Sequence, residues 1–291
     1  MNTSNYFNHI EICSSFEPRF STRLRHLIDG LFLGFRKLHF VEVIVTTKCN
    51  LRCRNCSNLI PDIQHKAVEI PFDMIKRDFD LLMSNFSYIY CLQIHGGEPL
   101  LHSEIDKILA YVLTYKDKIS IIKIVTNGTV MPSRKLLDVI SRQNVVICVS
   151  NYKINEGLRE KIKTICAANH VFFMQFAESK WHIFKNPEKE TCSISELKSR
   201  FRKCPNRMYP SCKNGKMYLC SRLANLMTLQ DDIADDGIEL SASSKRGAIR
   251  FLQKDYSINC AYCQVEDGIF CEAGIQQNKS TTDFIKYGKE Q

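Results

Sequence analysis

The hydrophobic pattern of the chain alternates between two periods in a regular order. Five short runs rich in β-branched residues predict buried strands. They cover 41–46, 88–95, 120–127, 145–151 and 171–176. Four intervening segments repeat their apolar residues at helical spacing. They cover 72–86, 103–115, 133–141 and 156–169. Strands that alternate with helices predict βαβ units, so we expect an α/β domain built on a parallel sheet.

The regular pattern has limits on both sides. Residues 1–40 show helical spacing interrupted by two glycines, and we interpret them as an N-terminal packing extension. After about residue 180 the alternation stops, and 186–203 are polar and helical in part. We therefore divide the chain into an extension (1–40), a barrel domain (41–190) and a small cysteine-rich domain (191–291). Ser103 is expected to be the N-cap of the helix over 103–115.

Composition narrows the class of protein. The 291 residues are 44% hydrophobic and 24% charged, as in soluble globular proteins. Lys and Arg exceed Asp and Glu by nine, but they are scattered, so we expect no nucleic-acid partner. A solvated basic surface is the favoured interpretation, and attraction to an acidic electron donor or a phosphorylated substrate is the alternative. The first residues lack a secretory signal and 27–35 is too short to span a bilayer, which predicts a cytoplasmic protein without membrane contact.

The 14 cysteines point to chemistry, because a reducing cytosol disfavours structural disulfides. Cys49, Cys53 and Cys56 follow the first predicted strand with the spacing Cys-x3-Cys-x2-Cys. A structural zinc site needs four ligands, whereas three thiolates leave one position of a metal site open for reaction. Functional groups of parallel α/β folds lie after the carboxyl ends of strands, which is where this loop falls.

This triad, together with "GGEP" at 96–99 after the second strand, resembles the radical S-adenosylmethionine (SAM) enzymes. The resemblance covers about residues 41–180 and implies a partial (βα)6 barrel. It also implies that the three thiolates bind three irons of a 4Fe–4S cluster. In that family the fourth iron binds SAM, whose reductive cleavage gives a 5′-deoxyadenosyl radical.

The same resemblance implies a set of SAM contacts at three strand ends. Gly96 and Gly97 would allow close approach of the methionine moiety, and Glu98 would orient its amino group. The full expected set is Gly96, Gly97, Glu98, Pro99, Thr126, Asn127, Ser150 and Asn151. An ordinary tight turn at Asn127 is an equally good interpretation. Asn55 departs from the family, in which an aromatic residue often precedes the third cysteine. His95 and His102 flank the glycine turn, and we assign neither a role.

Six further cysteines lie beyond residue 200, at positions 204, 212, 220, 260, 263 and 271. Asn214-Gly215 between short apolar arms predicts a type I′ hairpin. The pattern resembles the Twitch domain, a shortened SPASM domain that follows some radical SAM barrels. It implies one auxiliary 4Fe–4S cluster ligated by Cys204, Cys220, Cys260 and Cys263. A zinc ribbon on the same four thiolates is the alternative.

The remaining candidates concern the substrate. Cys212 and Cys271 are spare cysteines, either buried hydrophobes or hydrogen-atom donors. Arg222 is a candidate to bind an anionic group or assist proton removal. The other residues that we expect near the substrate are Gln175, Trp181, Tyr209 and Asn225. Packing at a domain interface is an equally good interpretation of Trp181, the single tryptophan.

One complete auxiliary cysteine set favours electron transfer, which suits a two-electron oxidation. The chain is similar in size and cysteine layout to the dehydrogenases of aminocyclitol antibiotic pathways. The leading hypothesis is therefore a radical SAM oxidoreductase that dehydrogenates a sugar-like or cyclitol alcohol, supplied with electrons by an acidic flavodoxin or ferredoxin. The alternatives are a radical carbohydrate epimerase, a ribosomal peptide maturase, and a non-catalytic iron–sulfur or zinc protein.

Overall fold

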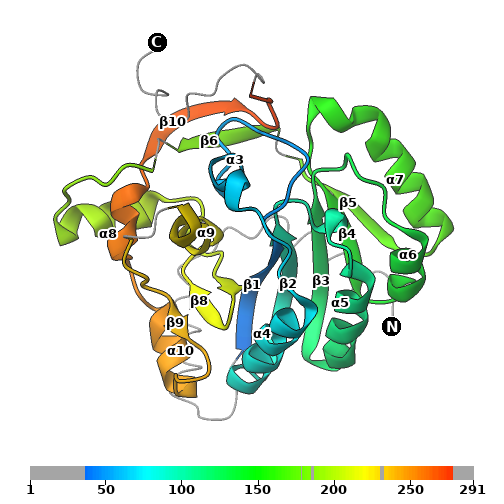
Figure 1. Ribbon diagram of the computed structural model, residues 1–291, viewed down its shortest axis with the longest axis horizontal. Coiled ribbons are helices and arrows are strands. Elements are labelled where there is room, and N and C mark those ends of the chain that lie inside the picture. Colours follow the sequence, from blue (N-terminus) through cyan, green and yellow to red (C-terminus); the bar gives the residue numbers. More distant parts are fainter. Residues whose placement is uncertain (1–36, 178, 185–186, 230–232, 278–291) are drawn as a thin grey trace.

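The computed structural model describes residues 37–177, 179–184, 187–229 and 233–277. Its main feature is an eight-stranded sheet in the order β5-β4-β3-β2-β1-β7-β8-β9 (Figure 1). The first five strands are parallel, which confirms the predicted α/β class. They are β1 (Lys37–Thr46), β2 (Tyr88–Gly96), β3 (Ile119–Thr126), β4 (Val145–Val149) and β5 (Phe172–Gln175). The predicted extension over 1–36 lies outside the described residues, and β1 starts at Lys37 rather than Val41.

The helices that link the parallel strands occur where helical spacing predicted them. They are α4 (Phe72–Asn85), α5 (Ile105–Val112), α6 (Arg134–Ile140) and α7 (Glu156–Ala168). The second of these helices is shorter than expected, because Leu113–Lys118 form a 3-10 helix. Its N-cap is Glu104, so the assignment of Ser103 as the cap was wrong. The Ser103 hydroxyl instead donates to the Glu69 carboxylate at 2.7 Å.

The cysteine-rich part adds strands to the same sheet. β7 (Ser211–Lys213) pairs parallel with β1, and β8 (Lys216–Tyr218) pairs antiparallel with β7. The turn residues Asn214 and Gly215 have φ angles of 54° and 80°, which confirms the predicted type I′ hairpin. β9 (Ile238–Glu239) ends the sheet. β7 is thus a sixth parallel strand of the sheet, although it lies beyond the domain boundary that we predicted near residue 190. The proposed division into domains stays a prediction.

The other elements are a second sheet of two strands and several shorter helices. β6 (Lys180–Phe184) and β10 (Val265–Glu272) form a separate antiparallel pair above the carboxyl ends of the parallel strands (Figure 1). The remaining α-helices are α3 (Ile60–Ile63), α8 (Ile194–Lys203), α9 (Ser221–Leu229) and α10 (Lys245–Leu252). Short 3-10 helices cover Gln64–Lys66, Pro99–Leu101, Lys153–Asn155 and Ile258–Tyr262. None of the helices in the described ranges is both long and apolar enough to cross a membrane.

Two apolar layers follow from the alternation along the strands. The outer face packs on the helices, with Val43, Phe79 and Leu82 fully buried, and each such side chain contributes about 1.5–3 kcal/mol on burial. The inner face holds a smaller cluster of Cys91, Ile121, Val146 and Cys148.

A buried carboxylate attaches the hairpin to α4. Asp78 lies on α4 with its side chain fully buried, and it accepts hydrogen bonds from the backbone N–H groups of Asn214 (3.0 Å) and Gly215. Burial raises the pKa of Asp78 from 3.8 to about 6, although both hydrogen bonds act in the opposite direction. The carboxylate holds β7 and β8 in register against the first half of the chain.

The raised pKa predicts a pH-dependent stability. The protonated form of Asp78 is favoured in the folded state, so its contribution to the free energy of unfolding is complete below about pH 4 and is lost as the pH rises through about 6. The difference in free energy of unfolding between wild type and Asp78→Asn should therefore fall by roughly 3 kcal/mol from about pH 4 to pH 7. Urea unfolding measures it, with Asp73→Asn on the exposed face of α4 as the charge-matched control. A pH-independent difference would contradict the assignment.

Candidate active site

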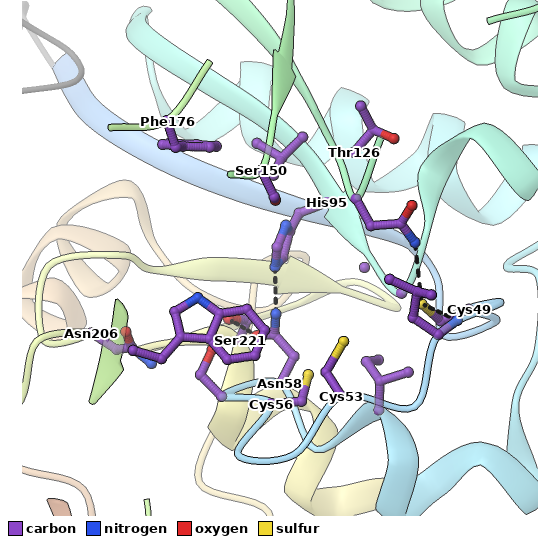
Figure 2. A pocket seen from close by; sticks show the side chains of 18 of the residues that line it. Cys49, Cys53, Cys56, Asn58, His95, Thr126, Ser150, Phe176, Asn206 and Ser221 are labelled. Carbon is purple, nitrogen blue, oxygen red and sulfur yellow. Dashed lines mark hydrogen bonds between the residues drawn. The ribbon is translucent and has the colours of Figure 1, made fainter. Parts of the chain in front are cut away.

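The cysteine triad lines a cavity of about 430 Å³ at the carboxyl ends of the strands. Figure 2 shows Cys49, Cys53 and Cys56 on one side of this cavity, opposite Thr126, Ser150 and Phe176. Burial raises the pKa of Cys49 to about 11 and of Cys53 to about 12, and it raises the pKa of Cys56 as well. A metal centre binds thiolates, so a cluster held by these three cysteines would supply the positive charge that favours their deprotonated form.

The glycine turn is joined to the triad loop by backbone contacts. Gly97 N–H donates to Thr46 O at 2.9 Å, and Glu98 N–H donates to Lys48 O at 2.8 Å. A Cβ on Gly96 would lie 2.0 Å from Thr46 O, and one on Gly97 would lie 2.1 Å from Lys48 O. Both glycines are therefore required by the protein's own backbone, in addition to the approach of a ligand that the sequence predicted. Gly96 and Gly97 also line the cavity.

Glu98 has a structural position that the sequence did not predict. Its carboxylate is fully buried and accepts hydrogen bonds from Leu100 N–H (3.0 Å), the Thr126 hydroxyl (2.8 Å) and Asn127 N–H (2.7 Å). Burial raises its pKa to about 7. Neither Glu98 nor Pro99 lines the cavity, and the Glu98 carboxylate links the ends of β2 and β3. The predicted contact between Glu98 and the SAM amino group stays a prediction.

The other two strand ends reach the cavity as predicted. Thr126, Asn127, Ser150 and Asn151 all line it. The Asn127 side-chain amide donates to Asn50 Oδ1 at 2.9 Å and lies 3.7 Å from the Cys49 sulfur. These two strand ends are tied together by the buried Asn155, whose amide donates to the backbone oxygens of Asn127 and Ser150 at 2.5 and 2.8 Å.

A C-terminal segment, absent from our predictions, completes the triad loop. Gln276 donates from Nε2 to the Cys53 sulfur at 3.1 Å and accepts from Arg52 N–H at 2.8 Å. The backbone of Arg54 also donates to Ile275 O at 2.7 Å.

Asn55 has a φ of 55°, a left-handed conformation that Asn tolerates better than an aromatic residue, which explains its departure from the family pattern.

A polar network connects the inner sheet face to the hairpin region. Asn58 lies between His95 and Ser221: its Nδ2 is 2.7 Å from His95 Nε2, and its Oδ1 accepts from the Ser221 hydroxyl at 2.6 Å (Figure 2). Asn225 is fully buried and donates to the Asn58 backbone oxygen at 3.0 Å. Lys213 donates to Asn225 Oδ1 at 3.0 Å, and burial lowers the pKa of Lys213 to about 8. Asn225 is therefore a structural residue rather than part of the cavity wall.

The substrate candidates are divided by the structure. Trp181 and Tyr209 line the cavity, whereas Gln175 is exposed outside it. Cys212 is fully buried in the outer core, where nothing links it to the cavity. Cys271 lies on β10 opposite Trp181 and contacts the Asn55 amide at 3.4 Å, also outside the cavity wall. The predicted hydrogen-donor roles of these two cysteines stay predictions, and burial removes the basis for Cys212.

The four cysteines of the second set gather around a smaller cavity. Cys204, Cys260 and Cys263 line a space of about 300 Å³. Burial raises the pKa of Cys220 well above its ordinary value, and the nearby thiols of the other three raise it further. Cys204 follows α8, Cys220 precedes α9, and the Cys-x2-Cys pair lies in the 3-10 helix over Ile258–Tyr262 and just beyond it. The hairpin and three helix ends therefore bring distant cysteines together.

Arg222 lies between the two cysteine sets. Its guanidinium group hydrogen-bonds the Cys263 thiol and opposes the rise that burial causes in the pKa of both Cys263 and Cys56. It also donates to Ser57 O at 3.3 Å and lies 4.9 Å from the centre of the Phe184 ring. The side chain is 3% exposed and does not line the large cavity, so the structure gives it no direct route to a substrate.

The sequence predicted two alternative metal centres for the second cysteine set, a 4Fe–4S cluster and a zinc ribbon. Within the described residues, no three or more His, Cys, Asp or Glu side chains are placed to hold a single metal ion. A zinc ribbon needs four thiolates about 2.3 Å from one atom. In a 4Fe–4S cluster each thiolate binds a different iron, so the sulfurs are farther apart. The auxiliary cluster and the zinc ribbon on these four cysteines both stay predictions.

Comparison with known proteins addresses the barrel half of the chain. Residues 43–168 match the model of the Radical SAM superfamily. The match includes the triad, the glycine turn and the Thr126 and Ser150 strand ends, and it supports a radical SAM enzyme that uses SAM and a 4Fe–4S cluster. It covers fewer than half of the 291 residues and ends before the second cysteine set. The resemblance to Twitch domains therefore stays a prediction.

Several characterised proteins are similar over part of their length. GTP 3′,8-cyclase of Aliarcobacter butzleri is 30% identical over 143 residues, which are 46% of this chain and 41% of the relative. The subtilosin biosynthesis protein AlbA of Bacillus subtilis is 26% identical over 120 residues, 41% of this chain and 25% of the relative. The chain thus spans less than half of these relatives. The crystal structure of BtrN with AdoMet and 2-DOIA is 16% identical, with a TM-score of 0.44 over 79% of this chain and 92% of that one.

The contact between Gln276 and Cys53 predicts a role in cluster retention. Gln276→Ala removes a hydrogen bond to a ligand sulfur and a support for the triad loop, so we expect loss of iron approaching one cluster, about four irons per chain. Iron analysis after anaerobic reconstitution and desalting measures the loss. Gln277→Ala is the matched control, because that residue contacts the loop through its backbone. Equal iron content in the two variants would contradict the prediction.

Proposed function

We propose that the protein is a radical SAM oxidoreductase that dehydrogenates an alcohol carbon of a sugar-like or cyclitol substrate. The observation that carries the proposal is one cavity lined by three thiols and by the ends of three parallel strands, together with a second set of four neighbouring thiols in the same structure. When bound, SAM and the triad cluster supply a radical that removes a hydrogen atom, and an auxiliary cluster supplies an acceptor for one electron.

The chain's own residues have separable tasks in this proposal. Cys49, Cys53 and Cys56 hold the first cluster, and the backbone of Gly96 and Gly97 forms the adjacent wall for SAM. Thr126, Asn127, Ser150 and Asn151 present hydrogen-bonding groups along the same wall. Trp181 and Tyr209 exclude water from the opposite side. An acidic flavodoxin or ferredoxin fits the surplus of nine basic residues as the electron donor.

The second cysteine set favours oxidation over the alternatives. Four thiolates from Cys204, Cys220, Cys260 and Cys263 leave no open position for substrate, which suits electron transfer. Arg222 supports this role, because a cation between the two sets reduces the repulsion between their charges. A carbohydrate epimerase would need Cys212 or Cys271 to face the substrate, but Cys212 is buried in the core and neither cysteine lines the cavity. Peptide maturation and the cyclisation performed by the first relative remain the competing reactions.

The test is an anaerobic assay with SAM, a reductant and a panel of cyclitols, amino sugars and sugar nucleotides. Wild type should form 5′-deoxyadenosine together with a ketone in equal amounts, detected by mass spectrometry. Cys53→Ser should lose both products because it removes a ligand of the first cluster. Cys260→Ser should keep 5′-deoxyadenosine formation and lose at least about tenfold in ketone, since it removes only the electron acceptor.

The outcomes separate the reactions. Deuterium incorporated at carbon from deuterated water, without a ketone, would indicate an epimerase and overturn dehydrogenation. Absence of 5′-deoxyadenosine with every alcohol tested would overturn the proposed substrate class. Iron analysis should give about eight irons per chain and no zinc, whereas about four irons would remove the auxiliary cluster.

A further inference from the structure

A carboxylate lies deep in the large cavity where no function has been assigned. Glu42 is on the inner face of β1 and is 5% exposed. It precedes Thr46, the last residue of β1, by four positions, which places it about 13 Å below the triad loop. Because the same cavity is lined by Glu42 and by Cys49, Cys53 and Cys56, it extends from the cluster loop down to this carboxylate.

The carboxylate is held by neighbours in one row of the sheet. Gln93 on β2 and Ser211 on β7 are the register partners of Glu42, so the three side chains lie on the same face. Gln93 Nε2 donates to Glu42 Oε1 and the Ser211 hydroxyl donates to Oε2, each at 2.8 Å. The Glu42 backbone N–H donates to Pro210 O at 2.9 Å. The position of the carboxylate is therefore fixed from both sides by neutral donors.

No cation of the described residues contacts this carboxylate. Lys123 is the register partner of Gln93 and lies two strands from Glu42 in the same row, and the two side chains form no ion pair. Lys180 lines the cavity from β6, but its side chain is exposed and does not pair with Glu42. Among the described residues, Glu42 therefore has neutral hydrogen-bond donors and no ion-pair partner.

We propose that Glu42 binds an ammonium group of the substrate, and that this contact holds the substrate beneath the triad loop. An ammonium group donates three hydrogen bonds, and each carboxylate oxygen of Glu42 has a lone pair left after its bond to Gln93 or Ser211. The inference rests on the proposed function, because it takes this cavity as the substrate site. It adds that the substrate carries an amine in addition to its alcohol groups.

The experiment measures binding, so it does not depend on turnover. Three matched pairs serve as probes: glucosamine and glucose, trans-2-aminocyclohexanol and trans-1,2-cyclohexanediol, and serinol and glycerol. Equilibrium binding to reconstituted protein with SAM is measured by calorimetry for wild type and Glu42→Gln. We expect at least one amine to bind wild type about tenfold or more tightly than its hydroxyl partner, as for a charged hydrogen bond. Glu42→Gln should abolish this preference.

Two further variants keep the result interpretable. Lys123→Met removes the ammonium group in the same row of the sheet as Glu42 and Gln93. It should preserve or increase the preference for amines, because the positively charged ligand is then repelled less. Asp117→Asn changes the net charge by the same amount as Glu42→Gln, but at an exposed position. It should leave the preference for amines unchanged. Thermal unfolding confirms that each variant folds. An equal preference in wild type and Glu42→Gln, or no amine preference in any pair, overturns the proposal.

Failure of this inference and failure of the proposed function give different results. If an amine binds through Glu42 but no ketone forms, dehydrogenation is excluded while the ammonium site stands. If ketone forms from a neutral alcohol with equal efficiency in wild type and Glu42→Gln, the proposed reaction stands and the ammonium site is excluded.

Discussion

The hydrogen bonds between the glycine turn and the residues before Cys49 determine the geometry of the whole site. Gly97 and Glu98 donate to the backbone of Thr46 and Lys48, and the close approach excludes a Cβ on Gly96 or Gly97. These contacts fix where the triad loop leaves β1. Glu98 then extends the connection to β3 through Thr126 and Asn127. One continuous set of backbone and carboxylate contacts therefore positions the cysteines relative to three strand ends.

Much of this arrangement was accessible from the sequence, because it follows from local rules. Period and spacing predicted the five parallel strands and four helices, and Asn214-Gly215 predicted its hairpin. The contacts that the sequence did not predict join residues that are far apart along the chain. No local signal relates Gln276 to Cys53, Asp78 to the hairpin turn, or Glu42 to Ser211. The structural use of Glu98 was missed because the motif alone does not reveal which lone pairs the fold already occupies.

The C-terminal half supplies much of the environment of the N-terminal triad. Gln276 contacts a ligand sulfur, Arg222 lies between Cys56 and Cys263, and Ser221 orients Asn58 at the cavity wall. These contacts are short-range and mostly buried, so each is sensitive to the position of the other half of the chain. The two cysteine sets are consequently linked through the side chain of Arg222, which interacts with a cysteine of each.

The pairing of β7 with β1 has a consequence for how the chain matures. The contact between Glu42 and Ser211 joins residues 169 positions apart, so the loop it closes is long and forms late. During synthesis, one edge of β1 stays unpaired until the ribosome has released the hairpin, and an unpaired edge can recruit other chains. The contact between Gln276 and Cys53 likewise forms only after most of the chain has been synthesised, so the triad loop receives its full set of neighbours late in folding.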